Sequence, residues 1–76
     1  MNNTRRKEIR KIISMIEDAK DDLESIKDEE EEAFENMPEG LQMSEKGEAS
    51  ENALSLLEDA IDELDEALSA MEDAIA

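Results

Sequence analysis

Apolar residues between positions 54 and 75 recur at alternating steps of three and four, and this pattern most constrains the fold of the 76-residue chain. Such spacing places the residues along one side of a helix, as in a coiled coil. We expect this seam to drive self-association; it comprises Leu54, Leu57, Ile61, Leu64, Leu68, Met71 and Ile75. A column of small residues runs beside it, and these are Ala53, Ala60, Ala67 and Ala74.

A second heptad pattern predicts a first helix over about residues 5–35, with Thr4 before its first turn. Its apolar residues are Ile9, Ile12, Ile16, Ala19, Leu23, Ile26, Ala33 and Met37, and the stripe is widened by Ile13 and Phe34. Glu30 occupies a seam position. We expect Glu30 to face solvent near the helix end; the alternative is a polar residue that sets the register of the helices.

The pattern breaks over about residues 36–43, where Pro38 disfavours a continuous helix and Gly40 permits a turn. This connector has room for one helical turn. Ser44 is expected to cap a second helix over about residues 45–75. Gly47 falls on the seam of that helix, which suggests a close approach to the first helix near the turn.

Two long helices joined by a short connector predict an all-α fold, an antiparallel two-helix coiled-coil hairpin forming a single domain, residues 1–76. One hairpin has only one interface between helices, yet both apolar stripes are wider than a two-residue seam. We therefore expect hairpins to assemble into a four-helix bundle or a larger oligomer.

The composition argues against catalysis. The chain has no cysteine and no histidine, which removes disulfides, thiolate metal ligands and the commonest general base. Serines inside the helices have no base to activate them. No glycine-rich phosphate loop and no calcium-loop spacing occurs. We predict a protein that is not an enzyme, with no catalytic residues, no cofactor and no metal site.

The net charge of −16 points to the class of partner. No lysine or arginine follows Lys46, so the outward face of the second helix is acidic. Such a face can meet a basic protein surface, and the candidate residues are Glu58, Asp62 and Asp65; solubility is the alternative explanation. The same charge disfavours direct binding to nucleic acid or to an anionic membrane, and we expect a cytoplasmic location.

Bases gather only near the start of the chain, at Arg5, Arg6, Lys7, Arg10 and Lys11. We expect this basic cluster to pair with the acidic end of the second helix in the hairpin. The alternative is an anion site for phosphate or a nucleotide in an oligomer, formed by Arg5, Arg6, Lys7 and Arg10. The acidic run at residues 28–32 is interpreted as a solvated helical face, or else as a patch for a basic partner.

Residues 31–42 (EEAFENMPEGLQ) and 44–48 (SEKGE), with the basic opening at residues 5–7 and the leucine and isoleucine pattern at 57–61, carry a resemblance. This combination resembles small acidic helical proteins encoded by bacteriophages and prophages. Compact hairpins of that kind include inhibitors of host defence. The resemblance implies no defined activity, but it favours an inhibitory role. We therefore expect a non-enzymatic accessory protein that acts as an acidic inhibitor or decoy of a host nucleic-acid-binding or defence protein, and a structural module whose role is self-association is the competing hypothesis. The resemblance implies no site residues.

Overall fold

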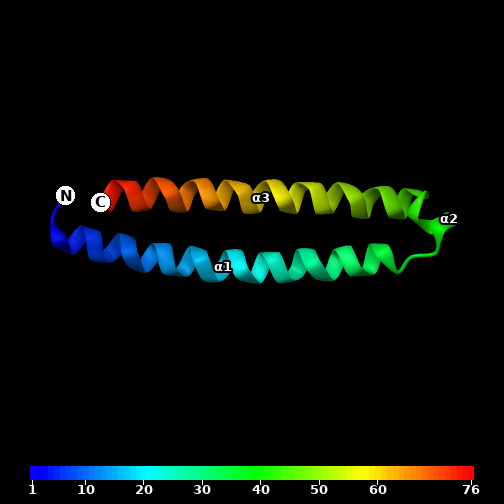
Figure 1. Ribbon diagram of the computed structural model, residues 1–76, viewed down its shortest axis with the longest axis horizontal. Coiled ribbons are helices and arrows are strands. Elements are labelled where there is room, and N and C mark those ends of the chain that lie inside the picture. The colour runs from blue at the N-terminus through cyan, green and yellow to red at the C-terminus, as the bar shows by residue number, and fades with distance from the viewer.

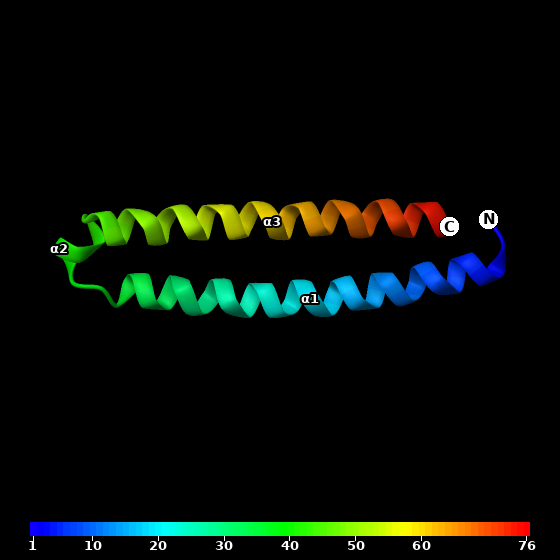
Figure 2. The same ribbon diagram turned by 180° about the vertical axis from the view of Figure 1, so that it is seen from behind.

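The computed structural model, which describes residues 1–76, is a hairpin of two long helices. Helix α1 (Asn3–Glu35) and helix α3 (Glu45–Ile75) run antiparallel, and the connector between them contains the short helix α2 (Glu39–Gln42). The helices lie side by side over their whole length, with both termini at the end opposite α2 (Figures 1 and 2). The all-helical prediction, with long helices and a short connector, is confirmed.

Helix α1 begins earlier than expected because Asn2, not Thr4, caps it. The Oδ1 atom of Asn2 accepts a hydrogen bond of 2.8 Å from the backbone N–H of Arg5, which satisfies one of the free donors of the first turn. The helix continues through the acidic run at residues 28–32, whose glutamates are good helix formers. It ends at Glu35, shortly before Pro38, whose ring cannot continue it.

The side chain of Gln42 fastens the connector to the end of α1. Its Nε2 atom donates to the carbonyl oxygens of Phe34 at 3.1 Å and Met37 at 3.2 Å. These carbonyls lie at and just beyond the end of the helix, where no further helical turn follows to supply donors. Ser44 occupies the N-cap position of α3, but its hydroxyl donates back to the carbonyl oxygen of Leu41 and does not cap the helix. The connector is therefore held at both of its ends.

Gly47 provides a close approach, although not to the helix that the sequence suggested. The glycine is buried in the first turn of α3. A Cβ atom placed there would overlap the carbonyl group of Gln42 and lie 2.6 Å from the carbonyl oxygen of Leu41. The atoms nearest to Gly47 therefore belong to the connector and not to α1, because α2 folds back over the start of α3.

The two stripes differ in how well the sequence predicted them. Along α3, the residues of the predicted seam are all buried or half-buried against α1 of the same chain, including Ile61 and Leu68 at 8% exposure. Along α1, half of the predicted stripe is wrong. Ile12, Ala19, Ile26 and Ala33 are exposed. The buried and half-buried seam positions are Ile9, Ile13, Ile16, Lys20, Leu23, Lys27, Glu30 and Phe34, with Met37 just beyond the helix, and Arg6 and Glu24 are also half-buried.

The difference corresponds to a rotation of α1 by about 50° about its own axis, because one of the two columns of the stripe shifts by one residue at about 100° per residue. Both candidate stripes share Ile9, Ile16 and Leu23, so hydrophobicity alone did not separate them. The observed rotation brings two lysines to the seam, where Lys20 reaches Asp65 of α3. As a consequence of this rotation, the side of α1 that carries Ile12 and Ile26 is exposed.

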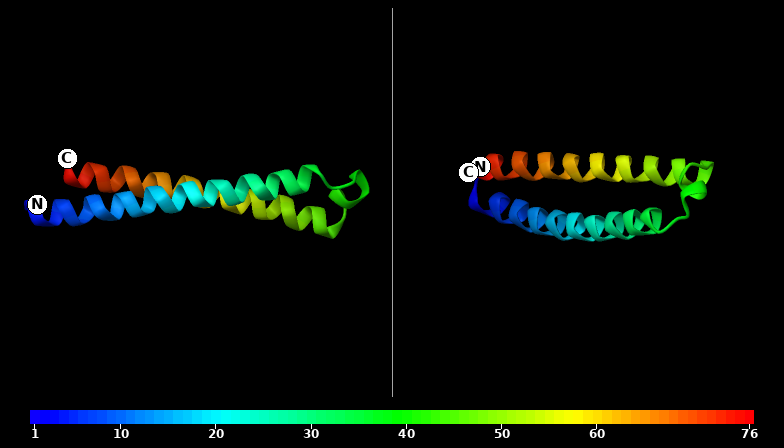
Figure 3. Two further views of the ribbon diagram at one scale, coloured as in Figure 1. Left: turned by 90° about the horizontal axis from the view of Figure 1, so that it is seen from below. Right: turned by 45° about the vertical axis from the view of Figure 1, so that its right-hand side comes forward.

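The hairpin is long and has little interior. Its principal extents are 58 × 15 × 13 Å and its radius of gyration is 17.2 Å, whereas a compact chain of this length has about 11 Å. Only five of 76 residues are buried, and no side chain falls below 2% exposure. The helices cross at a shallow angle near their middles, as coiled-coil helices do (Figure 3). Neither long helix has a stretch apolar enough to cross a bilayer.

Candidate functional site

The seam divides the hairpin into two long flanks, and one of them is acidic. On this flank each helix presents the residue four positions after a seam residue, so that a row repeats every seven residues. We call the two rows together the acidic flank: Glu17, Glu24 and Glu31 of α1, with Glu51, Glu58, Asp65 and Glu72 of α3. Three shallow hollows between the helices are each lined by residues of both rows, which shows that the rows share one side of the hairpin.

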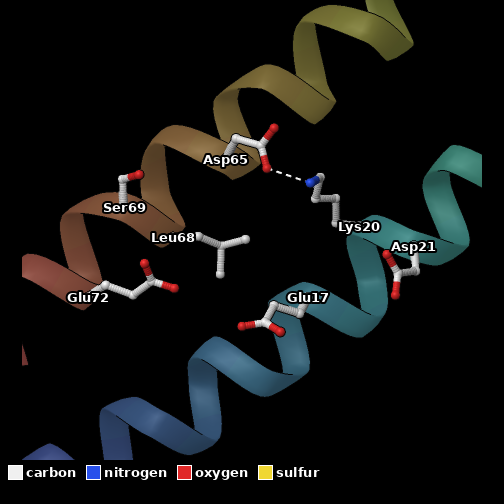
Figure 4. Close-up of a pocket in the computed structure, with 7 residues that line it drawn as sticks. All are labelled: Glu17, Lys20, Asp21, Asp65, Leu68, Ser69 and Glu72. Atoms are coloured by element: carbon white, nitrogen blue, oxygen red, sulfur yellow. Dashed lines mark ion pairs between the residues drawn. The ribbon is translucent and has the colours of Figure 1, made fainter.

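One hollow shows how a lysine on the seam organises this flank (Figure 4). Its lining residues are Glu17, Lys20, Asp21, Asp65, Leu68, Ser69 and Glu72. Leu68 points between the helices, while carboxylates stand on both sides. The Nζ atom of Lys20 lies 2.6 Å from Oδ1 of Asp65 across the helix interface and 3.6 Å from Oε1 of Glu24 on its own helix.

These contacts change the protonation equilibrium of the lysine. The hydrogen bond to Asp65 raises the pKa of Lys20 above its ordinary value of 10.5, desolvation opposes this effect without cancelling it, and the charges of Asp65 and Glu24 raise the pKa further. Lys20 is therefore fully protonated at neutral pH. It neutralises part of the charge on this flank, and Asp65 is already engaged within the fold.

The candidate partner residues predicted from the sequence are brought together. Glu58, Asp62 and Asp65 line another hollow of the acidic flank, beside Lys27 of α1. Glu58 and Asp62 are exposed and form no ion pair. Because Asp65 is paired with Lys20, the carboxylates free to meet a partner there are those of Glu58 and Asp62.

Two lysines of this flank were missed when the sequence was read for apolar periodicity. Lys20 and Lys27 follow Ile13 at seven-residue steps and lead to Phe34, so they continue a seam column that begins and ends with large apolar residues. That spacing was the available signal. Long lysine stems can cover apolar surface while their ammonium groups reach outward, which explains why they fit a seam position.

The basic cluster does not form the ion pairs expected of it. The only ion pairs of 4.0 Å or less are those of Lys20, although the cluster lies beside the acidic end of α3 (Figure 1). Arg6 is half-buried in the column of Ile13 and Lys20, and the other four bases are exposed. Arg6, Lys7 and Arg10 lie on the side of the acidic flank, whereas Arg5 lies in the column of Ile12 on the opposite side. The structure therefore separates one of the four candidate anion-site residues, and the anion site stays a prediction.

Glu30 does not face solvent freely, contrary to the expectation from its place near the helix end. It is half-buried on the seam, and its Oε1 atom accepts a hydrogen bond of 2.6 Å from the hydroxyl of Ser50 on α3. Ser50 is only 5% exposed. The two helices thus place one polar residue each in the same layer, which agrees with the alternative interpretation of Glu30 as a residue that sets the register.

No three acidic residues are grouped closely enough to hold a metal ion. The site is therefore a surface of carboxylates with two interspersed lysines. It has no enclosed cavity, and its charges are arranged along the length of the hairpin. Comparison of the chain with protein families, with characterised proteins and with solved structures finds no match.

Proposed function

We propose that the protein acts without catalysis, by presenting the acidic flank to a basic surface of another protein. The observation that carries the proposal is the pair of carboxylate rows, which repeat about every 10 Å along the hairpin. Surfaces that bind nucleic acid are basic and accept regularly spaced negative charges. The acidic flank offers such charges on a protein scaffold, so the partner class is a nucleic-acid-binding or defence protein that the hairpin blocks or decoys.

The electrostatics of the hairpin suit association of this kind. A net charge of −16 attracts a basic partner before contact and increases the association rate at low salt. The carboxylates of Glu58 and Asp62 are exposed, so each ion pair with a partner contributes only about 0.2–1 kcal/mol. Affinity then depends on several such pairs together and falls as salt screens them.

The resemblance to acidic proteins of bacteriophages supports a host-cell cytoplasmic setting and an inhibitory role. Solubility alone would not require the charges to be sorted. Glutamates and aspartates could then be interspersed with bases on every side of α3, with less repulsion between neighbours. Instead, the only base on α3 is Lys46, which is the second residue of that helix.

The test is a comparison of two variants with the same change in charge. Glu58→Gln with Asp62→Asn removes two free carboxylates from the acidic flank and leaves the Lys20–Asp65 pair intact. The control, Asp59→Asn with Glu63→Gln, removes two exposed carboxylates of α3 that lie away from this flank. A partner is first captured from host lysate with the parent protein, and its affinity is then measured by calorimetry at low and high salt.

We expect the acidic-flank variant to weaken binding about tenfold at low salt, since two ion pairs contribute about 1.4 kcal/mol together. The control should stay within about twofold. Equal losses in both variants would mean that only net charge matters. Unchanged binding in the acidic-flank variant would direct attention to the basic cluster.

The unit that binds is proposed to be two hairpins joined in a four-helix bundle. The supporting observation is the lack of an interior, since only five residues of one hairpin are buried. A single pair of helices buries one stripe on each, and a bundle of four buries a wider one. Self-association without any partner is the competing role, and it predicts that no host protein is captured.

A further inference from the structure

The flank opposite the carboxylates is apolar, and most of it is exposed, since only Ala53 and Ala60 among its residues are half-buried. On this side each helix presents the residue just before a seam residue, and the rows repeat every seven positions. We call them the apolar flank: Ile12, Ala19, Ile26 and Ala33 of α1, with Ala53, Ala60, Ala67 and Ala74 of α3. Ile12 is 46% exposed and Ile26 is 53% exposed, whereas the other four isoleucines and leucines of α1 are buried or half-buried.

The hairpin exposes more surface than a compact protein of its mass, as expected for a subunit separated from its partner. The accessible surface is 5668 Å². A compact chain of 8.6 kDa exposes about 4,700 Å², so this chain carries roughly 1,000 Å² in excess. Two copies that covered the excess would bury about 2,000 Å² together, which lies at the upper end of the range for stable, specific interfaces.

We infer that the apolar flank is the surface on which a second copy of this chain packs, with α1 of each hairpin lying on α3 of the other. The inference deepens the proposed four-helix bundle and rests on it, but it is independent of the acidic flank. A two-fold axis along the bundle relates the copies. Both connectors then lie at the same end, and every helix is antiparallel to its neighbours.

The sizes of the side chains favour this pairing of unlike helices. The α1 row contains two isoleucines, whereas the α3 row consists of alanines alone. When α1 lies on α3 of the copy, large residues meet small ones at both interfaces, which are identical by symmetry. If α1 lay on α1, isoleucines would hold one pair apart while alanines let the other pair approach, because the spacing of helices follows their contact residues.

Charges at the ends of the rows agree with the same arrangement. The start of α1 lies level with the end of α3 (Figure 1), and the two-fold axis preserves this level in the second copy. Arg5 and Lys11 border the α1 row, and Glu66 and Asp73 border the α3 row. The bases, which have no carboxylate within 4.0 Å in their own chain, therefore meet acids of the second copy. The acidic flank remains outside the bundle on both hairpins.

The first experiment measures the mass and dissociation constant by sedimentation equilibrium. Ile12→Gln with Ile26→Gln alters two residues that are already exposed in one hairpin, so the helices should persist, as circular dichroism can verify. Leu41→Gln with Met43→Gln is the matched control, since both residues are exposed but lie in the connector. We expect a dimer whose dissociation constant rises at least about 100-fold in the isoleucine variant and stays within a few-fold in the control.

The second experiment fixes which helices meet. The chain has no cysteine, so single substitutions give unambiguous cross-links between copies. The contacts of Lys20 with Asp65 and of Glu30 with Ser50 set the register, and they place Ala19 level with the turn of α3 between Ala60 and Ala67. Chains with Ala19→Cys should cross-link on oxidation when mixed with Ala60→Cys or Ala67→Cys chains, and each variant alone should not.

Three results would overturn the inference. The first is a monomer at micromolar concentration, which would also remove the proposed bundle while leaving the acidic flank unaffected. The second is a dimer that the isoleucine variant does not weaken, which would place the interface elsewhere. The third is a cross-linked dimer of Ala19→Cys chains alone, which would show that α1 packs on α1.

Discussion

Replacing Gly47 by alanine should destabilise the hairpin, although alanine is the better helix former. A glycine-to-alanine change inside a helix normally stabilises it by about 1 kcal/mol. Here the added Cβ would overlap the carbonyl group of Gln42 and crowd that of Leu41. Both are backbone atoms, so α2 must move as a unit to make room.

The cost follows from what holds α2 in place. Its movement withdraws the side chain of Gln42 from the carbonyl oxygens of Phe34 and Met37, which it contacts at 3.1 and 3.2 Å. Each such hydrogen bond contributes about 1 kcal/mol, and residual strain at the contact adds about 1 kcal/mol more. Against the gain in helix propensity, the net loss is roughly 2 kcal/mol, or a Tm lower by about 8–16 °C.

Gly40→Ala provides the matched control, because a Cβ atom at Gly40 meets nothing within 4 Å and the residue is also helical. Thermal melts followed by circular dichroism at one fixed protein concentration compare the two variants with the parent. Gly40→Ala should leave the Tm unchanged or raise it by a few degrees. If Gly47→Ala raised the Tm as well, the close packing of α2 on the start of α3 would be refuted.

Two further predictions concern polar contacts between the helices. Because the pKa of Lys20 is raised in the folded state, the contribution of this lysine to stability is complete below pH 10.5 and is lost as the pH rises through the folded-state pKa. Lys20→Met should therefore flatten the fall in Tm between about pH 10 and 12. An identical fall in parent and variant would contradict this prediction. A double-mutant cycle of Glu30→Ala and Ser50→Ala in urea unfolding should give a coupling of about 1–2 kcal/mol, whereas additivity within about 0.5 kcal/mol would show that the contact contributes nothing.

The buried face of α3 could be predicted from the sequence because the pattern of apolar residues allows only one such face. Its seam residues have alanines on one side and acids on the other, so only one face can be buried. The first helix admits two solutions, which share the column containing Ile9 and Ile16. A count of apolar residues selects the column of Ile12 and Ile26, whereas the structure selects that of Ile13, with Lys20 and Lys27. The missing information was the position of acids on the other helix.

At two positions the sequence indicated a contact correctly but did not identify its partner residue, and both failures have the same cause. Gly47 was correctly read as a place of close approach, and Glu30 was correctly recognised as a polar residue on the seam. The partner of each, Gln42 and Ser50, depends on how the connector folds and on the register of the helices, which heptad spacing alone does not determine. The clustering of Glu58, Asp62 and Asp65 was predictable because one helical face carries all three.

An isotope-filtered nuclear Overhauser measurement on isoleucine methyl groups tests the rotation of α1 and the use of its free flank most directly. Chains with labelled isoleucine methyls are mixed with unlabelled chains, so that contacts within a chain and between chains are separated. Ile13 and Ile16 should show contacts to leucine methyls of α3 within their own chain. Ile12 and Ile26 should show contacts to α3 alanines of the second copy. Contacts from Ile12 and Ile26 to the seam leucines of their own chain would contradict both claims.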